Sequence, residues 1–107
     1  MAIAQRATDA LLSFSKARDW GQFHTPENLS KSIAIEAAEL LECFQWSNEF
    51  DLEEIKGELA DVVSYCILLA QVTNIDLTEA ILEKVALNES RYPLEKSTGT
   101  STKYDRL

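Results

Sequence analysis

The chain has 107 residues, a formal net charge of −8, and only three Gly and two Pro. A chain of this length forms one small domain, and so few helix-breaking residues predict helix nearly throughout. Residues 1–83 carry five Lys/Arg and fifteen Asp/Glu, a net −10, whereas residues 84–107 carry five and three, a net +2. The acidic body argues against sequence-independent binding to a nucleic-acid polymer, which needs a basic surface.

The first predicted helix follows apolar residues at helical spacing from Ile3 to Phe14 and ends near Gly21. Residues 20–26 then form a loop that is rich in aromatic and hydrogen-bonding side chains. A simple connection between two helices does not need such side chains. The loop is therefore a candidate for a functional role.

The second predicted helix opens at Pro26, which suits the first turn of a helix. At 100° per residue, Glu36 and Glu39 border the apolar face of this helix, Glu39 at about −60° from Glu36. Glu42 falls at about −120° and is predicted to face solvent.

The third predicted helix follows a break at residues 48–51, where Asp51 and Glu54 form a plausible capping arrangement. Glu58 lies on the apolar stripe of this helix, and Asp61 flanks the stripe. The segment 62–70 is apolar on nearly every side, which predicts burial against more than one neighbour. We therefore expect a homo-oligomer with a subunit interface on this helix.

A fourth helix is predicted to be capped by Asp76 or Thr78 and to run to about Ser90. The fold class is thus all-α, a four-helix bundle over residues 1–96, with a polar, mobile tail at 97–107. The longest apolar run is too short to span a membrane, and no basic region followed by an apolar run opens the chain. We therefore expect a cytoplasmic protein without membrane contact.

The acidic couplets carry the chemistry that the sequence predicts. Residues at i and i+3 share one side of a helix, so Glu36 with Glu39, and Glu58 with Asp61, each aim two carboxylates in one direction. Antiparallel packing of the two helices would gather four carboxylates, an oxygen-only site that suits Mg²⁺ or Mn²⁺ better than zinc. The di-iron plan needs Glu-x-x-His couplets, and the only histidine is His24, in the loop. A solvated acidic helix pair has the same spacing, so spacing alone leaves both interpretations open.

Aromatic residues in polar loops suggest where a flat ligand would bind. Trp20 and Trp46 are candidates to stack on a nucleobase, with His24 reading the base edge. Each tryptophan would also suit a core or an interface. Tyr65, one turn beyond Asp61, is either a core tyrosine or a donor to a sugar or phosphate oxygen.

The spacing Glu36-x-x-Glu39, then Glu58-x-x-Asp61, resembles the MazG-type nucleotide pyrophosphohydrolases. These are all-α enzymes that use Mg²⁺ to cleave nucleoside triphosphates to the monophosphate and pyrophosphate. Similarity to the dCTP pyrophosphatase branch of that superfamily extends over most of the chain, through segments 18–29, 44–46, 61–65, 84–93 and 103–104. The fuller motif often begins Glu-Glu, and Ile35 stands at the first of these positions here, which leaves the ligand positions intact.

The resemblance implies an Mg²⁺-dependent hydrolase of dCTP-like nucleotides that cleanses the nucleotide pool and assembles as a tetramer rather than a dimer. It implies Mg²⁺ ligands at Glu36, Glu39, Glu58 and Asp61, with Glu39 as general base. It also implies substrate contacts from Tyr65, a phosphate clamp from Lys84, Asn88 and Arg91, and base contacts from Trp20, His24 and Trp46. The alternatives are a non-catalytic helical module for nucleotide binding or interaction, a solvated basic stripe in place of the clamp, and a related hydrolase of dUTP or modified nucleotides.

Overall fold

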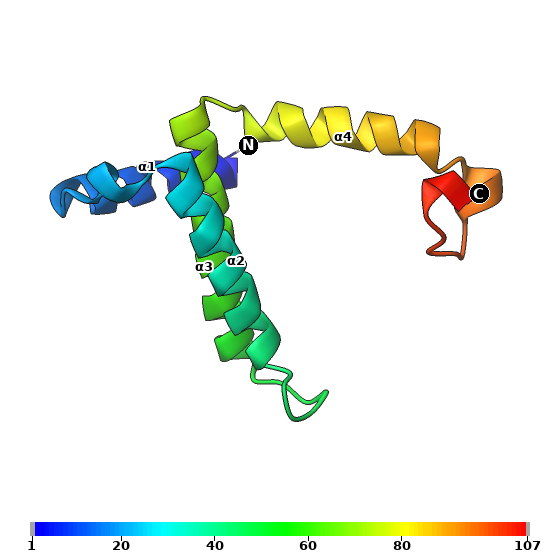
Figure 1. Ribbon diagram of the computed structural model, residues 1–107, viewed down its shortest axis with the longest axis horizontal. Helices are drawn as coiled ribbons and strands as arrows, with labels where there is room; N and C mark the ends of the chain where they lie inside the picture. The colour runs from blue at the N-terminus through cyan, green and yellow to red at the C-terminus, as the bar shows by residue number, and fades with distance from the viewer. Residues whose placement is uncertain (1, 107) are drawn as a thin grey trace. The chain divides into compact units, whose positions relative to one another are not determined.

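The computed structural model describes residues 2–106, which form helices and loops with no strand anywhere in that range (Figure 1). The all-α prediction is therefore confirmed. The chain forms two compact units, of which the first ends at Ile75 and the second begins at Asp76. In chain order the elements are α1 (Ala2–Ala17), the 3₁₀ helix η1 (Trp20–Phe23), α2 (Pro26–Glu42), α3 (Leu52–Thr73), α4 (Leu77–Arg91), α5 (Leu94–Ser97) and η2 (Tyr104–Arg106).

The first unit is built on an antiparallel hairpin of α2 and α3, which lie side by side and are joined by the loop 43–51 (Figure 1). Helix α1 packs against α3 and η1. The buried apolar side chains come from the first turn of α2 and the last third of α3: Leu29, Ile67, Leu68 and Ala70. The core of this unit therefore lies at the end of the hairpin that is remote from the 43–51 loop.

The predicted helix boundaries agree with the caps that the structure shows. The Thr25 hydroxyl accepts a hydrogen bond from the Asn28 amide at 3.1 Å, immediately before Pro26 opens α2. Asp51 caps α3, and its carboxylate accepts a hydrogen bond from the Glu53 amide at 2.9 Å. The predicted capping arrangement instead required a hydrogen bond from the Glu54 amide. These side chains satisfy amides that have no partner within the first helical turn.

The second unit consists of α4 and the segment that follows it. Asp76 caps α4, accepting a hydrogen bond from the Glu79 amide at 3.1 Å. The rings of Tyr92 and Tyr104 meet edge to face with their centroids 6.0 Å apart, and the Arg91 guanidinium lies 4.5 Å from the centroid of the Tyr104 ring. The C-terminal segment thus packs against the end of α4. The predicted division into 1–96 and 97–107, and the predicted four-helix bundle, stay predictions.

Several large apolar side chains of the hairpin are exposed in the single chain. Leu41 is 71% exposed, and Val63, within the apolar run 62–70, is 47% exposed, although Ile67 and Leu68 in the same run are buried. The run is thus only partly covered by its own chain, and the homo-oligomer stays a prediction. No single helix among residues 2–106 is long and apolar enough to cross a membrane; α3 and α4 together meet those criteria by length and composition only.

Loss of the Asp51 cap will measurably destabilise the protein. Asp51→Ala removes the acceptor for the Glu53 amide, and we expect the free energy of unfolding to fall by about 0.5–2 kcal/mol. Asp51→Asn keeps a side-chain oxygen at the cap and should stay close to the wild type. Urea unfolding followed by circular dichroism measures both changes. Equal stabilities for the Ala and Asn variants would contradict this role of the cap.

Candidate functional site

Three carboxylates from the two hairpin helices converge. Glu36 on α2 and Glu58 and Asp61 on α3 each offer one oxygen, and these oxygens lie within 4.8 Å of one another. Glu58 and Asp61 face the same way because they are three residues apart on one helix. Antiparallel packing of α2 against α3 brings Glu36 to them. The fourth predicted ligand, Glu39, lies outside this trio but close enough for its charge to act on Glu36 and Glu58.

Mutual repulsion and partial burial shift the titration of two of these acids. A hydrogen bond with the Glu39 carboxyl, with smaller contributions from desolvation and from the charges of Glu39, Asp61 and Glu58, raises the pKa of Glu36 to about 7. Desolvation, followed by the charges of Glu39 and Asp61, also raises the pKa of Glu58. A hydrogen bond between two carboxyls requires that one of them is protonated. When no cation lies beside it, Glu36 therefore keeps its proton to a higher pH than an ordinary glutamate.

Two oxygens of the cluster have no partner within the protein. Oε2 of Glu36 and Oε2 of Glu58 are buried and form no hydrogen bond with any group of residues 2–106. A buried carboxylate oxygen without a partner is costly, and a cation is the partner that would compensate all of the acids at once. The donor set, carboxylate oxygens alone, matches the ligands that hard divalent cations prefer. The cluster could therefore hold a divalent metal ion.

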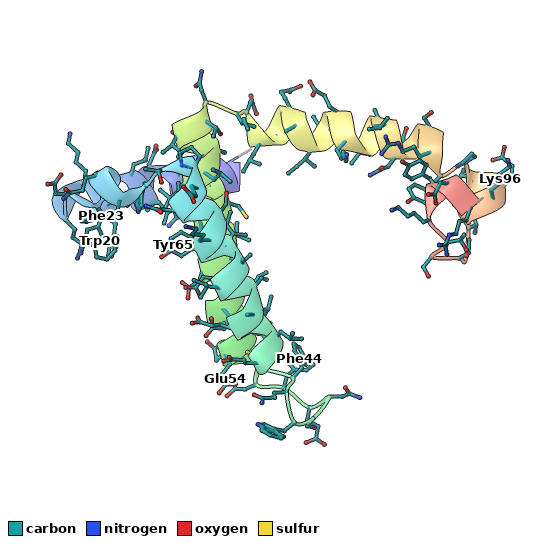
Figure 2. The ribbon with its side chains drawn as sticks, viewed as in Figure 1. Trp20, Phe23, Phe44, Glu54, Tyr65 and Lys96 are labelled. Atoms are coloured by element: carbon teal, nitrogen blue, oxygen red, sulfur yellow. The ribbon has the colours of Figure 1, made fainter. Side chains whose placement is uncertain are left out.

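A cavity of about 270 Å³ opens beside the start of α2. Three of the predicted substrate residues, Trp20, His24 and Tyr65, come together in its wall, and Figure 2 shows Trp20 on the η1 segment and Tyr65 on α3. The remaining lining residues were not predicted as site residues: Phe23, Asn28, Leu29 and Ser32.

Polar contacts hold the η1 segment that carries Trp20 and His24. The Asn28 side-chain amide donates to the carbonyl of Phe23 at 3.0 Å, tying this segment to the first turn of α2. Asp19 adopts a left-handed conformation with φ 53°, and the Gln22 side chain donates to its carbonyl at 3.0 Å. The sequence predicted an irregular loop here. The turn and the 3₁₀ helix were missed because they depend on contacts that helical periodicity does not report.

The cavity and the carboxylates are neighbours along both helices of the hairpin. Ser32 in the cavity precedes Glu36 by four residues on α2, and Asp61 precedes Tyr65 by four residues on α3. Four residues correspond to a rise of about 6 Å, slightly more than one turn. Spacing from Glu36 could have identified Ser32 as a site residue. With a cation held by the acids, the arrangement would suit a ligand with an aromatic ring at one end and negatively charged oxygens at the other.

Trp46 does not share the cavity with Trp20. It is 90% exposed in the loop that follows α2, whereas the cavity lies where α2 begins. A helix of 17 residues is about 25 Å long, so a single chain does not place both tryptophans on one base. Figure 2 likewise shows Phe44, just before Trp46, at the opposite end of the hairpin from Trp20.

The predicted phosphate-binding residues all lie on α4. Lys84, Asn88 and Arg91 follow one another at helical spacing, so they share a face of the helix. Lys84 is exposed, whereas Asn88 and Arg91 are half-buried. The Arg91 guanidinium stacks on Tyr104.

The fold and the acidic cluster define a class of protein that comparison with known sequences identifies: the chain belongs to the MazG-like family. The sequence model of that family matches residues 31–107, which include all four predicted metal ligands. Among individual proteins, dCTP pyrophosphatase 1 of Mus musculus and of Homo sapiens are each 36% identical over 104 residues, covering 88% of this chain. The chain spans about 61% of the length of these relatives. A crystal structure of a pyrophosphatase from Archaeoglobus fulgidus is 41% identical, with a TM-score of 0.76 over 83% of this chain and 91% of the other.

The raised pKa of Glu36 makes the stability of the metal-free protein depend on pH. An ordinary glutamate titrates near pH 4.5, so between about 4.5 and about 7 the folded chain binds a proton that the unfolded chain has lost. Its stability therefore falls as pH rises through that window, and Glu58 adds a shift of the same sign. We expect the melting temperature in EDTA to fall from pH 4.5 to 7.

The matched variants are Glu36→Gln, which should flatten this slope, and Glu49→Gln, whose side chain is exposed in the 43–51 loop and whose loss should preserve the slope. Thermal melts of the three proteins at half-unit pH steps measure the effect. A wild-type melting temperature that stays constant or rises over the window would contradict the raised pKa of Glu36.

Proposed function

We propose that this chain is a Mg²⁺-dependent nucleoside triphosphate pyrophosphohydrolase that cleaves dCTP-like nucleotides to the monophosphate and pyrophosphate. The feature that supports this most directly is the carboxylate cluster one turn away, on both helices, from a cavity with an aromatic wall. The relatives named dCTP pyrophosphatase 1 and the A. fulgidus pyrophosphatase support the same chemistry. Cleansing of the cytoplasmic nucleotide pool is the role we assign to it.

Glu36, Glu39, Glu58 and Asp61 are the proposed ligands of Mg²⁺, or of Mn²⁺. A divalent cation held there would offset the charge of the phosphates and acidify a bound water. The two buried oxygens without partners support this assignment, since carboxylates so placed gain most from a cation. Mg²⁺ would also let a polyanionic substrate approach a protein whose net charge is −8.

Glu39 is the proposed general base, which takes a proton from the attacking water. It lies next to the trio of converging oxygens without belonging to it, and this position beside the proposed metal favours it as the base over the other three acids. The Tyr65 hydroxyl, in the cavity wall four residues beyond Asp61 on α3, is the proposed donor to a sugar or phosphate oxygen. Trp20 offers a surface on which a base can stack, and His24 can read its edge.

Lys84, Asn88 and Arg91 are the proposed ligands of the leaving pyrophosphate. Two cations and an amide on one helical face offer the donors that phosphate oxygens accept. Cleavage between the α- and β-phosphates releases a product with several negative charges, which such a face stabilises.

The proposed assembly is a homo-oligomer, a tetramer in preference to a dimer. The hairpin exposes large apolar side chains that a second copy would cover, and Trp46 can reach a Trp20 cavity only if another copy supplies it. Light scattering at micromolar concentration should show a mass above that of a single chain, 12.0 kDa, and about four times that mass for the tetramer. A stable monomer would contradict the proposed assembly. The variant Leu59→Glu places a charge at a half-exposed apolar position of α3 and should lower the measured mass.

The activity itself is tested by release of pyrophosphate from a panel of nucleotides, with Mg²⁺ and with EDTA. We expect turnover of dCTP only with Mg²⁺. Glu39→Gln and Asp61→Asn should each lower kcat by at least ~10²-fold, because one removes the base and the other a metal ligand.

Glu49→Gln serves as the control, since this exposed glutamate of the 43–51 loop lies outside the cluster, and it should retain wild-type rates. Near-normal rates for both Glu39→Gln and Asp61→Asn would contradict the site. A rise in melting temperature with dCTP and Mg²⁺, but no product, would show a nucleotide-binding module in place of an enzyme.

A further inference from the structure

We propose that Phe14 and Arg18, at the end of α1, are positioning residues that hold the ring of Trp20 ready to stack on the nucleobase. The inference rests on the proposed function, because it takes the cavity beside Trp20 as the base site. It goes beyond that function because Phe14 and Arg18 do not line the cavity and would act only through Trp20. Each step depends on contacts within the first compact unit.

Arg18 is fixed at two points by Phe14. Its guanidinium carbon lies 3.8 Å from the centroid of the Phe14 ring, and its Nη1 donates a hydrogen bond to the Phe14 carbonyl at 3.1 Å. The two residues are four apart, so they share a face of α1. That carbonyl lies in the last turn of the helix, where carbonyls lack helical partners and a positive charge is favourable. Arg18 therefore completes the helix end and covers one face of the Phe14 ring.

Phe14 in turn contacts Trp20. The two ring centroids are 5.4 Å apart and the ring planes are inclined by 78°, the edge-to-face arrangement that aromatic pairs prefer. A nearly perpendicular contact covers at most one face of the indole. Trp20 is 44% exposed and lines the cavity, so at least one indole face stays available to a base.

The backbone between these residues brings the rings together. Asp19 turns the chain with φ 53°, an uncommon conformation for a residue other than glycine. The Gln22 amide donates to the Asp19 carbonyl at 3.0 Å and also lies 3.3 Å from its carboxylate. This turn reverses the chain at the end of α1, so Trp20 folds back onto Phe14. The Trp20 ring is thus ordered before any ligand arrives.

An ordered Trp20 ring is expected to increase the affinity for the nucleotide. A free, mobile tryptophan would lose rotamer freedom when a base stacks on it, and Phe14 removes that cost in advance. Stacking does not change between bound substrate and transition state, because the reaction takes place at the phosphates. Loss of Phe14 should therefore raise KM for dCTP by ~3–10-fold with kcat unchanged, the pattern of uniform binding.

The decisive variants are Phe14→Leu, which removes the ring, and Phe14→Tyr, which keeps it and can leave its hydroxyl in water because Phe14 is 46% exposed. Phe14→Leu should show the raised KM, and Phe14→Tyr should restore the wild-type value. Arg18→Met, which keeps the stem without the guanidinium, should show a smaller rise. Leu12→Ala, at a side chain of similar exposure on the same helix, controls for general loosening of α1 and should leave KM unchanged.

A second measurement needs no activity. In a Trp46→Phe background Trp20 is the only tryptophan, and Phe14→Leu should increase the quenching of its fluorescence by acrylamide and lower its anisotropy. A Phe14→Leu variant with unchanged KM and unchanged quenching would overturn the inference, and so would a fall in kcat at constant KM. If the wild type releases no pyrophosphate, the proposed function fails, and the fluorescence comparison alone then decides whether Phe14 orders Trp20.

Discussion

The packing of α2 against α3 is the constraint on which the site depends. Each helix carries two acids three residues apart, and antiparallel packing brings three of the four, Glu36, Glu58 and Asp61, into one cluster with oxygens within 4.8 Å. The same packing places Tyr65 of α3 in the cavity with Asn28 and Ser32 of α2. A rotation of either helix by one residue, about 100°, would remove its acids from the cluster and its residue from the cavity together.

That packing is costly for a chain of this size. The buried apolar core of the first unit is small, and the same hairpin holds two buried carboxylate oxygens without a partner. Repulsion among these acids opposes folding whenever they are ionised together, and it contributes, after the hydrogen bond with Glu39 and desolvation, to the raised pKa of Glu36. A bound cation and burial of the exposed apolar side chains by further subunits both act against this cost, so stability and function are expected to share the same requirements.

Local pattern was sufficient to predict most of the fold. The helices begin and end within a few residues of the predicted positions, because caps such as Asp51 and Asp76 and the proline at 26 act within one turn. Helical spacing also predicted that Glu36, Glu58 and Asp61 border apolar faces, and the structure brings these three together. The exposure of Glu42 was predicted in the same way.

What the sequence did not predict depends on contacts between elements. The left-handed turn at Asp19 and the hydrogen bond from Asn28 to Phe23 join residues of different segments, and no periodicity reports them. The separation of Trp46 from Trp20 within one chain follows from the length of α2, which the sequence did predict. That both contact one base stays a prediction, and it requires two copies of the chain. The rise of a helix fixes the distance between the cavity and the acids along its axis. Ser32 and Glu36 on α2, like Tyr65 and Asp61 on α3, are separated by a rise of about 6 Å. A ligand that contacts both the cavity and the acids must match that spacing, so the length of the ligand is expected to be one determinant of binding to the hairpin.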